Sequence, residues 1–544
     1  MSRPQFFVAA LVGLLSALSV AALATPAPSS AYARARIARF GASGMRVLGP
    51  VPSSQVIQLV LLPKYDHQDQ LAKLGEAQAT VGSPFYHHFL TGAQFKNYFG
   101  PSNATLNTLF SALRSNGFHI DRVSRSGDLV VASAYAPAVE KLFGTPLYTV
   151  RRPNGAIRYA NLNQFSMPAA LASSVYSLTG LDSATESVPF TRVMNPNDST
   201  KFFGATPQQL EGANDMPVTH GYSGSYNQVL TVLIDGLPKP SDVASFLSEN
   251  GIKDCYPLHQ VEIGGAGTDF TEATLDVETI SATAPCAYLA IYALPNLSNN
   301  SVLQGVNSFV NNNASGNSAT LSMSFGECDN ADTGYDNSLH QETNTGRAKG
   351  QTFLAGSGDN GYNHCGNNQS GPADVPASDD LVVAVGGTSP DTEYNVVWQG
   401  GPHGQYGWQG SGGGTSSYYG KPPYQNSLSC SKRCVPDIAL PADPYGGLLM
   451  YCTQCGFPYN PYPVGGTSLA SPLAAAGFAE MAQMRGSAIG FAGNALYADY
   501  TGNGYSSGEL VDITAGNNGY QARPGWDFVT GIGTPDWYLL SKAI

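Results

Sequence analysis

Five short apolar runs in the second part of the chain constrain its fold most strongly. None alternates between apolar and polar residues, as a strand with one solvent-facing side would. Gly, Asp or Ser residues mark the ends of the runs. Helical segments such as 242–250 and 338–350 lie between them, so the pattern predicts buried parallel strands. We therefore expect an α/β domain with a doubly wound, mostly parallel sheet, whose functional residues follow the carboxyl ends of the strands. The runs are QVLTVLIDG (228–236), CAYLAIYAL (286–294), ATLSMSFG (319–326), QTFLAGSGD (351–359) and DLVVAVGGT (380–388).

The first part of the chain has a different pattern, and 544 residues are more than one ordinary domain needs. The stretches 55–63 and 127–136 resemble strands, whereas 104–117 and 135–144 carry apolar residues at helical spacing. This alternation predicts a compact α+β domain in front of the parallel sheet.

The N-terminus combines a basic start with a long apolar run, and Ala22–Ala24 fits a small-x-small cleavage site. We expect residues 1–24 to be a secretory signal peptide, so that the protein is secreted and extracellular. The α+β domain then covers 25–185, a polar and turn-rich linker and cleavage region covers 186–200, and the α/β domain covers 201–544.

Charge divides the chain at the same place. Residues 25–185 carry fourteen Lys or Arg against seven Asp or Glu, whereas residues 186–544 carry twelve against thirty-two. A basic first domain can dock on an acidic body by electrostatic attraction, although two domains of unrelated charge would give the same count.

The eight cysteines all follow residue 250. In an exported protein an even number of cysteines favours disulfides, whose pairing the sequence does not give. The close spacing in CSKRC (430–434) and CTQC (452–455) also fits a zinc site, which is the alternative.

The segment PVGGTSLASP (463–472) places a serine between a glycine pair and a helical stretch. Gly465 and Gly466 suit a tight turn, and Ser468 starts the predicted helix 468–484. A serine displayed there becomes a nucleophile only if a base removes its proton. No histidine lies near it in sequence, so the base must come from elsewhere.

Carboxylates in the α/β domain are candidates for that base. In DFTEATLDVETISATAP (269–285), Glu272 and Asp276 are four residues apart, so in a helix they share one face and can share a proton. The apolar end of this segment predicts a buried helix rather than a solvated one. Asp359 ends the run 351–359, in a glycine-lined turn.

These motifs together resemble the sedolisin family of serine-carboxyl peptidases, which includes kumamolisin. In that family an N-terminal activation prodomain precedes a subtilisin-like body, so the resemblance implies that 25–185 is a prodomain and that the doubly wound sheet is subtilisin-like. The body carries a Glu-x-x-x-Asp pair, an Asp in a small-Gly-Asp turn, and a nucleophile in Ser-Gly-Thr-Ser-x-x-x-Pro. Here Gly465 replaces the first Ser of the last motif, a position that is not the nucleophile. The stretches 83–102, 376–388 and 435–447 are also similar to the family, so the resemblance covers nearly the whole chain after the signal.

The resemblance implies a role for each of four side chains. Ser468 would form the acyl-enzyme, with Glu272 as its general base and Asp276 as the partner that tunes Glu272. Asp359 would donate a hydrogen bond to the oxyanion while protonated, together with the backbone N–H of Ser468. Coupled carboxylates stay partly ionised near about pH 3–5, where a histidine of pKa about 6.5 is charged, so the resemblance implies action in acid.

A Ser-His-Asp site on the same fold is the rival interpretation. Asp235 ends a predicted strand, and histidines are available in the α/β domain, but none starts a helix in a small-Gly-x-His motif. We therefore expect Asp235 to be structural. The histidines are His220, His259, His340, His364 and His403.

Two glycine-rich loops near the C-terminus hold Asp512 and Asp527. Two carboxylates with backbone carbonyls suit Ca²⁺, whereas hydrogen bonds from Asp to the backbone would hold the loops without an ion. The resemblance implies a calcium site here, with carbonyl ligands at Ile513, Arg523 and Gly525. The family usually has glycine where Arg523 stands.

We thus expect a secreted acid endopeptidase, made as a self-processed proenzyme whose propeptide inhibits it from within the same chain. Its other partners would be protein and peptide substrates, with no nucleic acid, no membrane anchor and a monomeric state. The alternatives are a catalytically inactive homologue with a binding role, and a tripeptidyl-peptidase in place of an endopeptidase.

Overall fold

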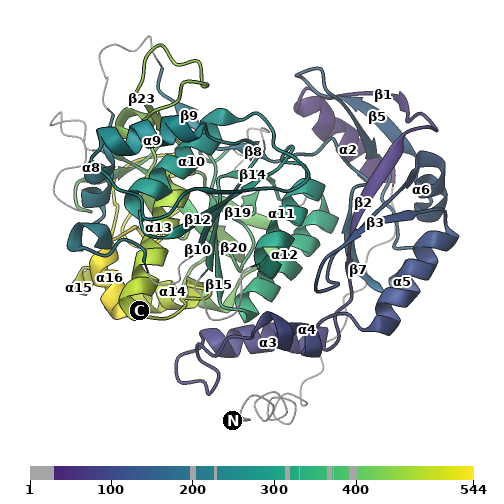
Figure 1. The fold of residues 1–544 in the computed structure, drawn as a ribbon, viewed down its shortest axis with the longest axis horizontal. Helices are drawn as coiled ribbons and strands as arrows, with labels where there is room; N and C mark the ends of the chain where they lie inside the picture. The colour runs from purple at the N-terminus through teal and green to yellow at the C-terminus, as the bar shows by residue number, and fades with distance from the viewer. Residues whose placement is uncertain are drawn as a thin grey trace.

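The computed structural model describes residues 30–195, 204–225, 229–312, 319–329, 331–363, 365, 371, 373–390 and 402–544. The expected signal peptide and the end of the expected linker, residues 196–200, lie outside them. The described chain forms a prodomain and a larger body that lie side by side (Figure 1). No described helix is long and apolar enough to cross a membrane.

An eight-stranded sheet forms the centre of the body. Its order is β11-β12-β10-β13-β15-β17-β18, with β21 also paired to β17, and every pairing except β17–β18 is parallel. The predicted α/β parallel fold is therefore confirmed. The strands are β10 (Val229–Ile234), β11 (His259–Glu262), β12 (Tyr288–Ala293), β13 (Ala319–Met323), β15 (Gln351–Gly356), β17 (Val383–Pro390), β18 (Gln405–Gly407) and β21 (Ile438–Pro441).

Helices cover both faces of this sheet. On β10, Leu230 and Val232 belong to the core shared with α10 and α13, whereas Leu233 belongs to the core shared with α11 and α12. Burial on both faces explains why the strands lack polar alternation. The covering helices are α9 (Pro240–Glu249), α10 (Phe270–Thr283), α11 (Asn299–Asn312), α12 (Thr333–Ala348) and α13 (Thr467–Arg485).

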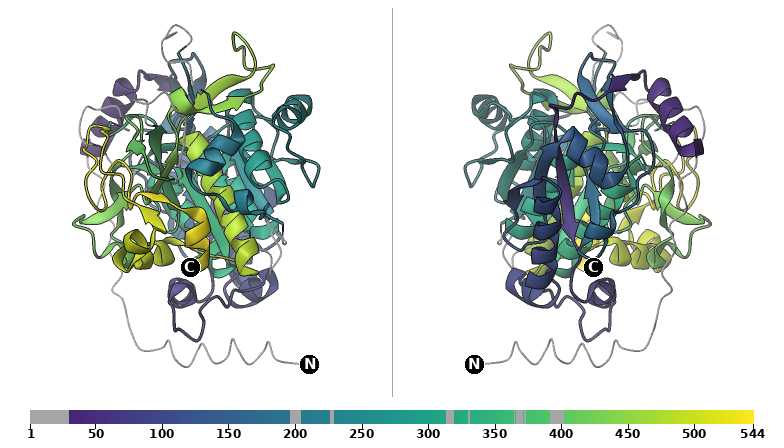
Figure 2. Two further views of the ribbon diagram at one scale, coloured as in Figure 1. Left: turned by 90° about the vertical axis from the view of Figure 1, so that its left-hand side faces the viewer. Right: turned by 90° about the vertical axis from the view of Figure 1, so that its right-hand side faces the viewer.

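The prodomain centres on a four-stranded antiparallel sheet of order β3-β4-β2-β7. One face packs on its own helices through Leu59 and Leu61, and the other packs on the body through Val60 and Leu62. The predicted α+β prodomain is thus present, and Figure 2 shows it lying against the body. These elements are β2 (Val56–Pro63), β3 (His119–Val123), β4 (Val130–Tyr135), β7 (Val175–Thr179), α5 (Asn103–Ser115) and α6 (Ala136–Phe143).

Smaller elements complete the prodomain. A second sheet of order β1-β5-β6 lies with α2, while α3 and α4 run beneath the body (Figure 1). Their bounds are α2 (Ser30–Ala42), β1 (Arg46–Pro50), α3 (Gln68–Ala79), α4 (Gly92–Tyr98), β5 (Leu147–Arg151) and β6 (Ile157–Asn161).

The start of the expected linker forms two short strands on the body. Strand β8 (Val188–Pro189) pairs antiparallel with β14 (Phe325–Cys328), and β9 (Arg192–Val193) pairs antiparallel with β23 (Tyr462–Gly465). The polar sequence gave no sign of these strands, because their partners belong to the body.

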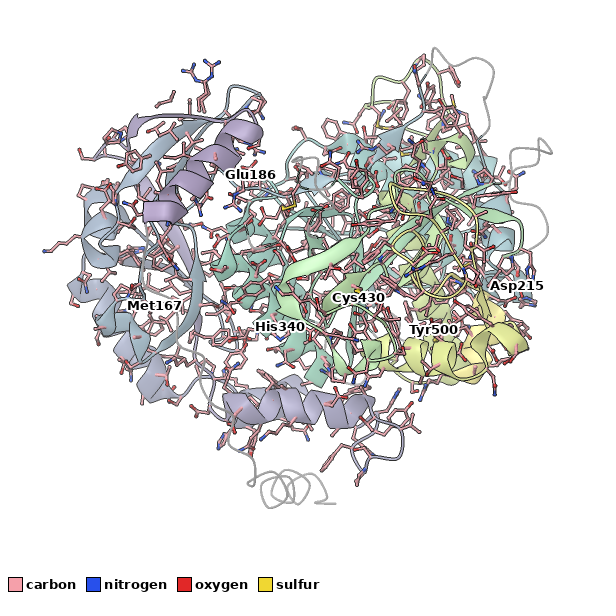
Figure 3. All side chains as sticks on the ribbon, turned by 180° about the vertical axis from the view of Figure 1, so that it is seen from behind. Met167, Glu186, Asp215, His340, Cys430 and Tyr500 are labelled. Carbon is pink, nitrogen blue, oxygen red and sulfur yellow. A yellow bond between two sulfur atoms is a disulfide. The ribbon has the colours of Figure 1, made fainter. Side chains whose placement is uncertain are left out.

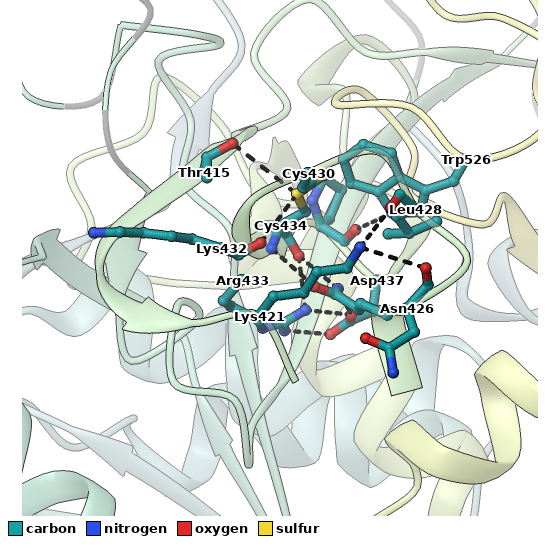
Figure 4. Close-up of a disulfide and its surroundings, with 12 residues drawn as sticks. Thr415, Lys421, Asn426, Leu428, Cys430, Lys432, Arg433, Cys434, Asp437 and Trp526 are labelled. Carbon is teal, nitrogen blue, oxygen red and sulfur yellow. Dashed lines mark hydrogen bonds and ion pairs between the residues drawn. A yellow bond between two sulfur atoms is a disulfide. The ribbon is translucent and has the colours of Figure 1, made fainter. Parts of the chain in front are cut away.

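All eight cysteines form disulfides, and the zinc alternative is therefore wrong. Two of the bridges close the short loops 430–434 and 452–455, and the other two are Cys255–Cys286 and Cys328–Cys365. The first of the short loops lies beside a buried ion pair in which both terminal nitrogens of Arg433 are 2.6 Å from the Asp437 carboxylate (Figure 4).

Candidate active site

Ser468 lies in the first turn of α13, at the end of β23. The chain passes from strand to helix through Gly466, whose φ of 97° lies in the left-handed region that favours glycine. A methyl group on Gly466 would also clash with the Phe190 carbonyl oxygen and with Asp359 Oδ2. The glycine before the nucleophile is thus required by both its backbone angle and its neighbours.

Glu272 is the carboxylate that reaches Ser468. The Ser468 hydroxyl donates to Glu272 Oε2 at 2.8 Å and lies 3.2 Å from the Ser324 carbonyl oxygen. Glu272 stands in the first turn of α10, where its N–H donates to the N-cap Asp269. Both Ser468 and Glu272 are almost fully buried. Residues 196 positions apart in the chain therefore form one hydrogen-bonded pair, in which the hydroxyl has a carboxylate as acceptor.

Asp276 lies one turn further along α10 and is fully buried. Its carboxyl is hydrogen-bonded to that of Glu272, and its Oδ1 accepts from the Ser324 hydroxyl at 2.8 Å. Burial raises the pKa of Glu272, and the charge of Asp276 raises it further. Burial likewise raises the pKa of Asp276, although the Ser324 hydrogen bond opposes this. The two carboxyls therefore titrate as a coupled pair, which keeps a proton at a pH where an isolated carboxyl would already have lost it.

Asp359 follows β15 directly and faces the start of α13. Its Oδ1 accepts from the backbone N–H of Thr467 at 2.7 Å and from the Thr467 hydroxyl at 2.9 Å. Its Oδ2 lies over Gly466, next to the Phe190 carbonyl oxygen. The structure thus brings all four predicted side chains, Glu272, Asp276, Asp359 and Ser468, to one place.

Residues of the expected linker also enter this site. The Thr191 hydroxyl donates to Glu272 Oε2, the same oxygen that Ser468 contacts. Arg192 donates to the Asp359 carbonyl oxygen at 3.1 Å and to Asn360 Oδ1 at 2.8 Å. Sequence analysis missed Thr191, Arg192 and Ser324. The position of Ser324 at the end of an apolar run was the one local signal available.

The histidines of the rival interpretation pair elsewhere. His220 is 2.9 Å from Asp215, and His340 is 3.1 Å from Asp379 and 3.4 Å from Asp380. Burial lowers the pKa of His340, but these two carboxylates outweigh it and raise it to about 9. His364 lies outside the described residues.

Burial raises the pKa of Asp235 to about 6, and the Asp269 charge adds to this.

The loop 523–525 connects the two carboxylates of the expected calcium site. The N–H of Arg523 donates to Asp527 Oδ2, and the N–H of Gly525 donates to Asp512 Oδ2, each at 2.9 Å. Asp512 Oδ1 is buried and accepts no hydrogen bond. A buried carboxylate oxygen in this state fits a cation, since desolvation of an unpaired charge is costly. The residues present are therefore compatible with Ca²⁺.

A second group of possible metal ligands lies on the body. His340, Asp379 and Asp380 offer ligand atoms within 4.8 Å of one another, and Figure 3 labels His340 among them. The same two carboxylates raise the pKa of His340, so without an ion the three side chains form an ion-pair network.

Comparisons with known proteins agree with this geometry. The family described as "Pro-kumamolisin, activation domain" matches residues 43–184, and the "Subtilase family" matches residues 262–500. Sedolisin of Pseudomonas sp. is 29% identical, over 95% of this chain and 92% of that protein. Kumamolisin of Bacillus sp. is 26% identical, over 91% of this chain and 93% of that protein.

The chain belongs to the sedolisin family. A solved structure supports the assignment: Pseudomonas sedolisin, complexed with two molecules of pseudo-iodotyrostatin, aligns at a TM-score of 0.51 and 27% identity. The alignment covers 62% of this chain and 97% of that one. The protein is therefore a serine-carboxyl peptidase that carries an activation domain, and the sedolisin-type assignment made from the sequence is confirmed.

Proposed function

We propose that this sedolisin-family protein is a secreted, acid-acting endopeptidase in which Ser468 is the nucleophile and Glu272 its general base. The observation that carries the proposal is the 2.8 Å hydrogen bond from Ser468 Oγ to Glu272 Oε2 in a buried site. A hydroxyl attacks a peptide carbonyl only when its proton has an acceptor, and Glu272 is that acceptor.

The reaction follows from the positions of the four side chains. Ser468 Oγ attacks the carbonyl carbon while Glu272 takes its proton. Asp359, in its protonated form, and the backbone N–H of Ser468 stabilise the oxyanion. Glu272 returns the proton to the leaving amine, and water then hydrolyses the acyl-enzyme with Glu272 again as the base.

The buried carboxyl pair supports action in acid. Glu272 must be ionised to accept a proton, while its hydrogen bond to Asp276 needs one proton on the pair. Both conditions hold in the singly protonated state. At high pH the loss of this proton leaves two buried charges, and it also removes the proton from Asp359 that the oxyanion needs.

Endopeptidase action is supported by the path of the linker, which is paired with the body for several residues before it reaches Ser468. Chain residues on the N-terminal side of Phe190 continue along the body through β8, and the Ser187 N–H donates to the Leu297 carbonyl oxygen at 3.1 Å. Glu186 bridges to Ser298 beyond that point. A tripeptidyl-peptidase needs a groove that ends three residues before the cut bond.

The prodomain acts, in this proposal, as an intramolecular inhibitor that acid releases. Its sheet covers α11 and α12, and Glu76 of α3 forms an ion pair with Arg347 of α12 at 2.8 Å. Protonation of carboxylates weakens such pairs as well as the attraction between a basic prodomain and an acidic body. A prodomain affinity that rises steadily from pH 7 to pH 4 would contradict this part of the proposal.

Calcium, bound by Asp512, Asp527 and the carbonyls of Ile513, Arg523 and Gly525, would stabilise the C-terminal loops. It would supply positive charge to buried carboxylates and take no part in peptide hydrolysis. Secretion is supported by the signal-like N-terminus and the disulfides.

Casein digestion at pH 3–4 tests the function. The acid-treated full-length protein should digest casein, and Ser468→Ala should not. Ser506→Ala, at an exposed serine, is the matched control and should behave as the unchanged protein. Equal activity of Ser468→Ala would refute the assignment, and an inactive unchanged protein would favour a binding role. A peptide library separates internal cleavage from release of tripeptides.

A further inference from the structure

The segment 186–194 lies along the body as an added strand on both sides of Ser468. Before the site, Val188 pairs with Gly326; after it, Arg192 pairs with Gly465. The backbone N–H of Met194 donates to the Pro463 carbonyl oxygen at 3.3 Å. Antiparallel addition of an extended peptide to strands of a host is a recurrent way of binding peptides, and here the host strands flank the nucleophile.

Three contacts place the Phe190–Thr191 peptide bond on Ser468. The Phe190 N–H and the Ser468 hydroxyl both donate to the Ser324 carbonyl oxygen, at 3.1 Å and 3.2 Å. The Thr191 hydroxyl and Ser468 both donate to Glu272 Oε2. The Phe190 carbonyl oxygen lies over Gly466 next to Asp359 Oδ2, the donor proposed for the oxyanion.

The Phe190 side chain occupies a pocket whose floor is made by two glycines. Only 3% of Phe190 is exposed. A Cβ atom built on Gly326 would lie 2.7 Å from Cζ of the ring, and one built on Gly356 would lie 3.2 Å from Cδ2. The ring therefore fills the space that side chains at these two positions would take.

We propose that Phe190–Thr191 is the bond first cut when the proenzyme matures, and that the pocket over Gly326 and Gly356 selects an aromatic residue before the cut bond. The proposal rests on the proposed function and deepens it by naming the maturation site and the preferred substrate class. Glu186 lies where the chain crosses from prodomain to body (Figure 3), so a cut just beyond it breaks the covalent link between the two.

The step follows the proposed mechanism with the chain as its own substrate. Ser468 Oγ forms an ester with the Phe190 carbonyl carbon, Glu272 takes the hydroxyl proton, and the bond to the Thr191 nitrogen breaks. The Thr191 amine leaves with the proton from Glu272. Water hydrolyses the ester, which leaves a carboxyl group on Phe190 and returns the hydroxyl of Ser468.

Acid treatment of the full-length protein tests the site. At the earliest time at which cleavage is detected, intact mass and N-terminal sequencing should give a body that begins at Thr191. Phe190→Asp should slow this cut at least about tenfold, because a charge replaces a buried ring, and Phe190→Tyr should keep it. A first cut elsewhere, or unchanged processing of Phe190→Asp, would overturn the proposal.

The matured body tests the pocket separately. With synthetic peptides, kcat/KM should be highest for an aromatic residue before the cut bond, and Gly326→Ala should lower it for Phe about tenfold relative to Ala. A casein-digesting enzyme without this preference overturns the inference and leaves the proposed function intact. Loss of all digestion at every acidic pH, with Ser468 present, would instead count against the proposed function.

Discussion

Nε of Arg192 lies 3.5 Å from Oδ2 of Asp359, so a residue of the uncut linker forms an ion pair with the carboxyl proposed to stabilise the oxyanion. The pair favours the charged carboxylate, which accepts hydrogen bonds and donates none. Arg192 also donates hydrogen bonds to the Asp359 carbonyl oxygen and to Asn360 Oδ1. We therefore expect the uncut chain to restrain its own active site through this ion pair until acid weakens it.

Arg192→Gln should let maturation proceed at higher pH. The Arg192 side chain is 42% exposed, so solvent screens the pair, and a pair worth about 0.2–1 kcal/mol corresponds to a shift of about 0.2–0.7 pH units. The measurement is the rate of loss of full-length protein between pH 3 and pH 7. Arg192→Lys keeps the charge and is the control; if both variants shift equally, the charge is not responsible.

Glu272→Gln should lower kcat by about a thousandfold without unfolding the protein, because Gln keeps the shape and cannot accept the Ser468 proton. Casein digestion measures the loss of activity, and circular dichroism shows whether the variant remains folded. Residual activity within tenfold of the unchanged enzyme would exclude Glu272 as the general base.

Asp276→Asn should move the alkaline limb of the kcat/KM profile to higher pH. The active pair holds its one proton on Asp276, and loss of that proton places a second charge beside Glu272, which the variant cannot form. A pH profile of peptide hydrolysis measures the shift. A purely structural role of Asp276 would lower activity equally at every pH and leave the limb in place.

The sequence predicted the catalytic carboxylates because their geometry is local. Four-residue spacing on a helix gives Glu272 and Asp276 one face, and the apolar remainder of α10 explains its burial. The strands of the parallel sheet could also be predicted, because a strand that is buried on both faces is a continuous apolar run in the sequence.

Contacts between residues far apart in the chain have no local sequence pattern and could not be predicted. Thr191 reaches Glu272 over 81 residues of sequence, and Ser324 reaches Asp276 over 48. Such contacts depend on the register of strands that pair only in the folded chain. The sequence of the linker is polar and turn-rich and gives no local sign of a strand. Residues 188–193 become extended because they pair with strands of the body.

Chelation should lower the Tm of the matured enzyme if the C-terminal loops bind Ca²⁺. Removal of the ion would leave Asp512 Oδ1 buried without a partner. Added Ca²⁺ should restore the Tm, whereas Mg²⁺, which prefers rigid octahedral sites, should not. Asp512→Asn should have a lower Tm that no longer responds to either treatment. An unchanged Tm of the unaltered enzyme in chelator would exclude the site.

The protein should be more stable in acid than at neutral pH, and Glu480 should contribute to this difference. Glu480 of α13 and Glu211 are buried near each other. Burial raises the pKa of Glu480, as does the Glu211 charge, and burial raises that of Glu211 to about 7. The folded state thus holds protons that the unfolded state releases, so stability is complete below about pH 4.3 and is lost as pH rises toward 7.

Urea unfolding of full-length Ser468→Ala, which cannot digest itself, measures this loss between pH 4 and pH 7. Adding Glu480→Gln should flatten the curve by up to about 1.4 kcal/mol per pH unit, which is the effect of one proton. Glu262→Gln, at an exposed glutamate, should leave the curve unchanged. If Glu480→Gln and Glu262→Gln gave the same curve, Glu480 would be charged in the folded protein, and its burial would not contribute to acid stability.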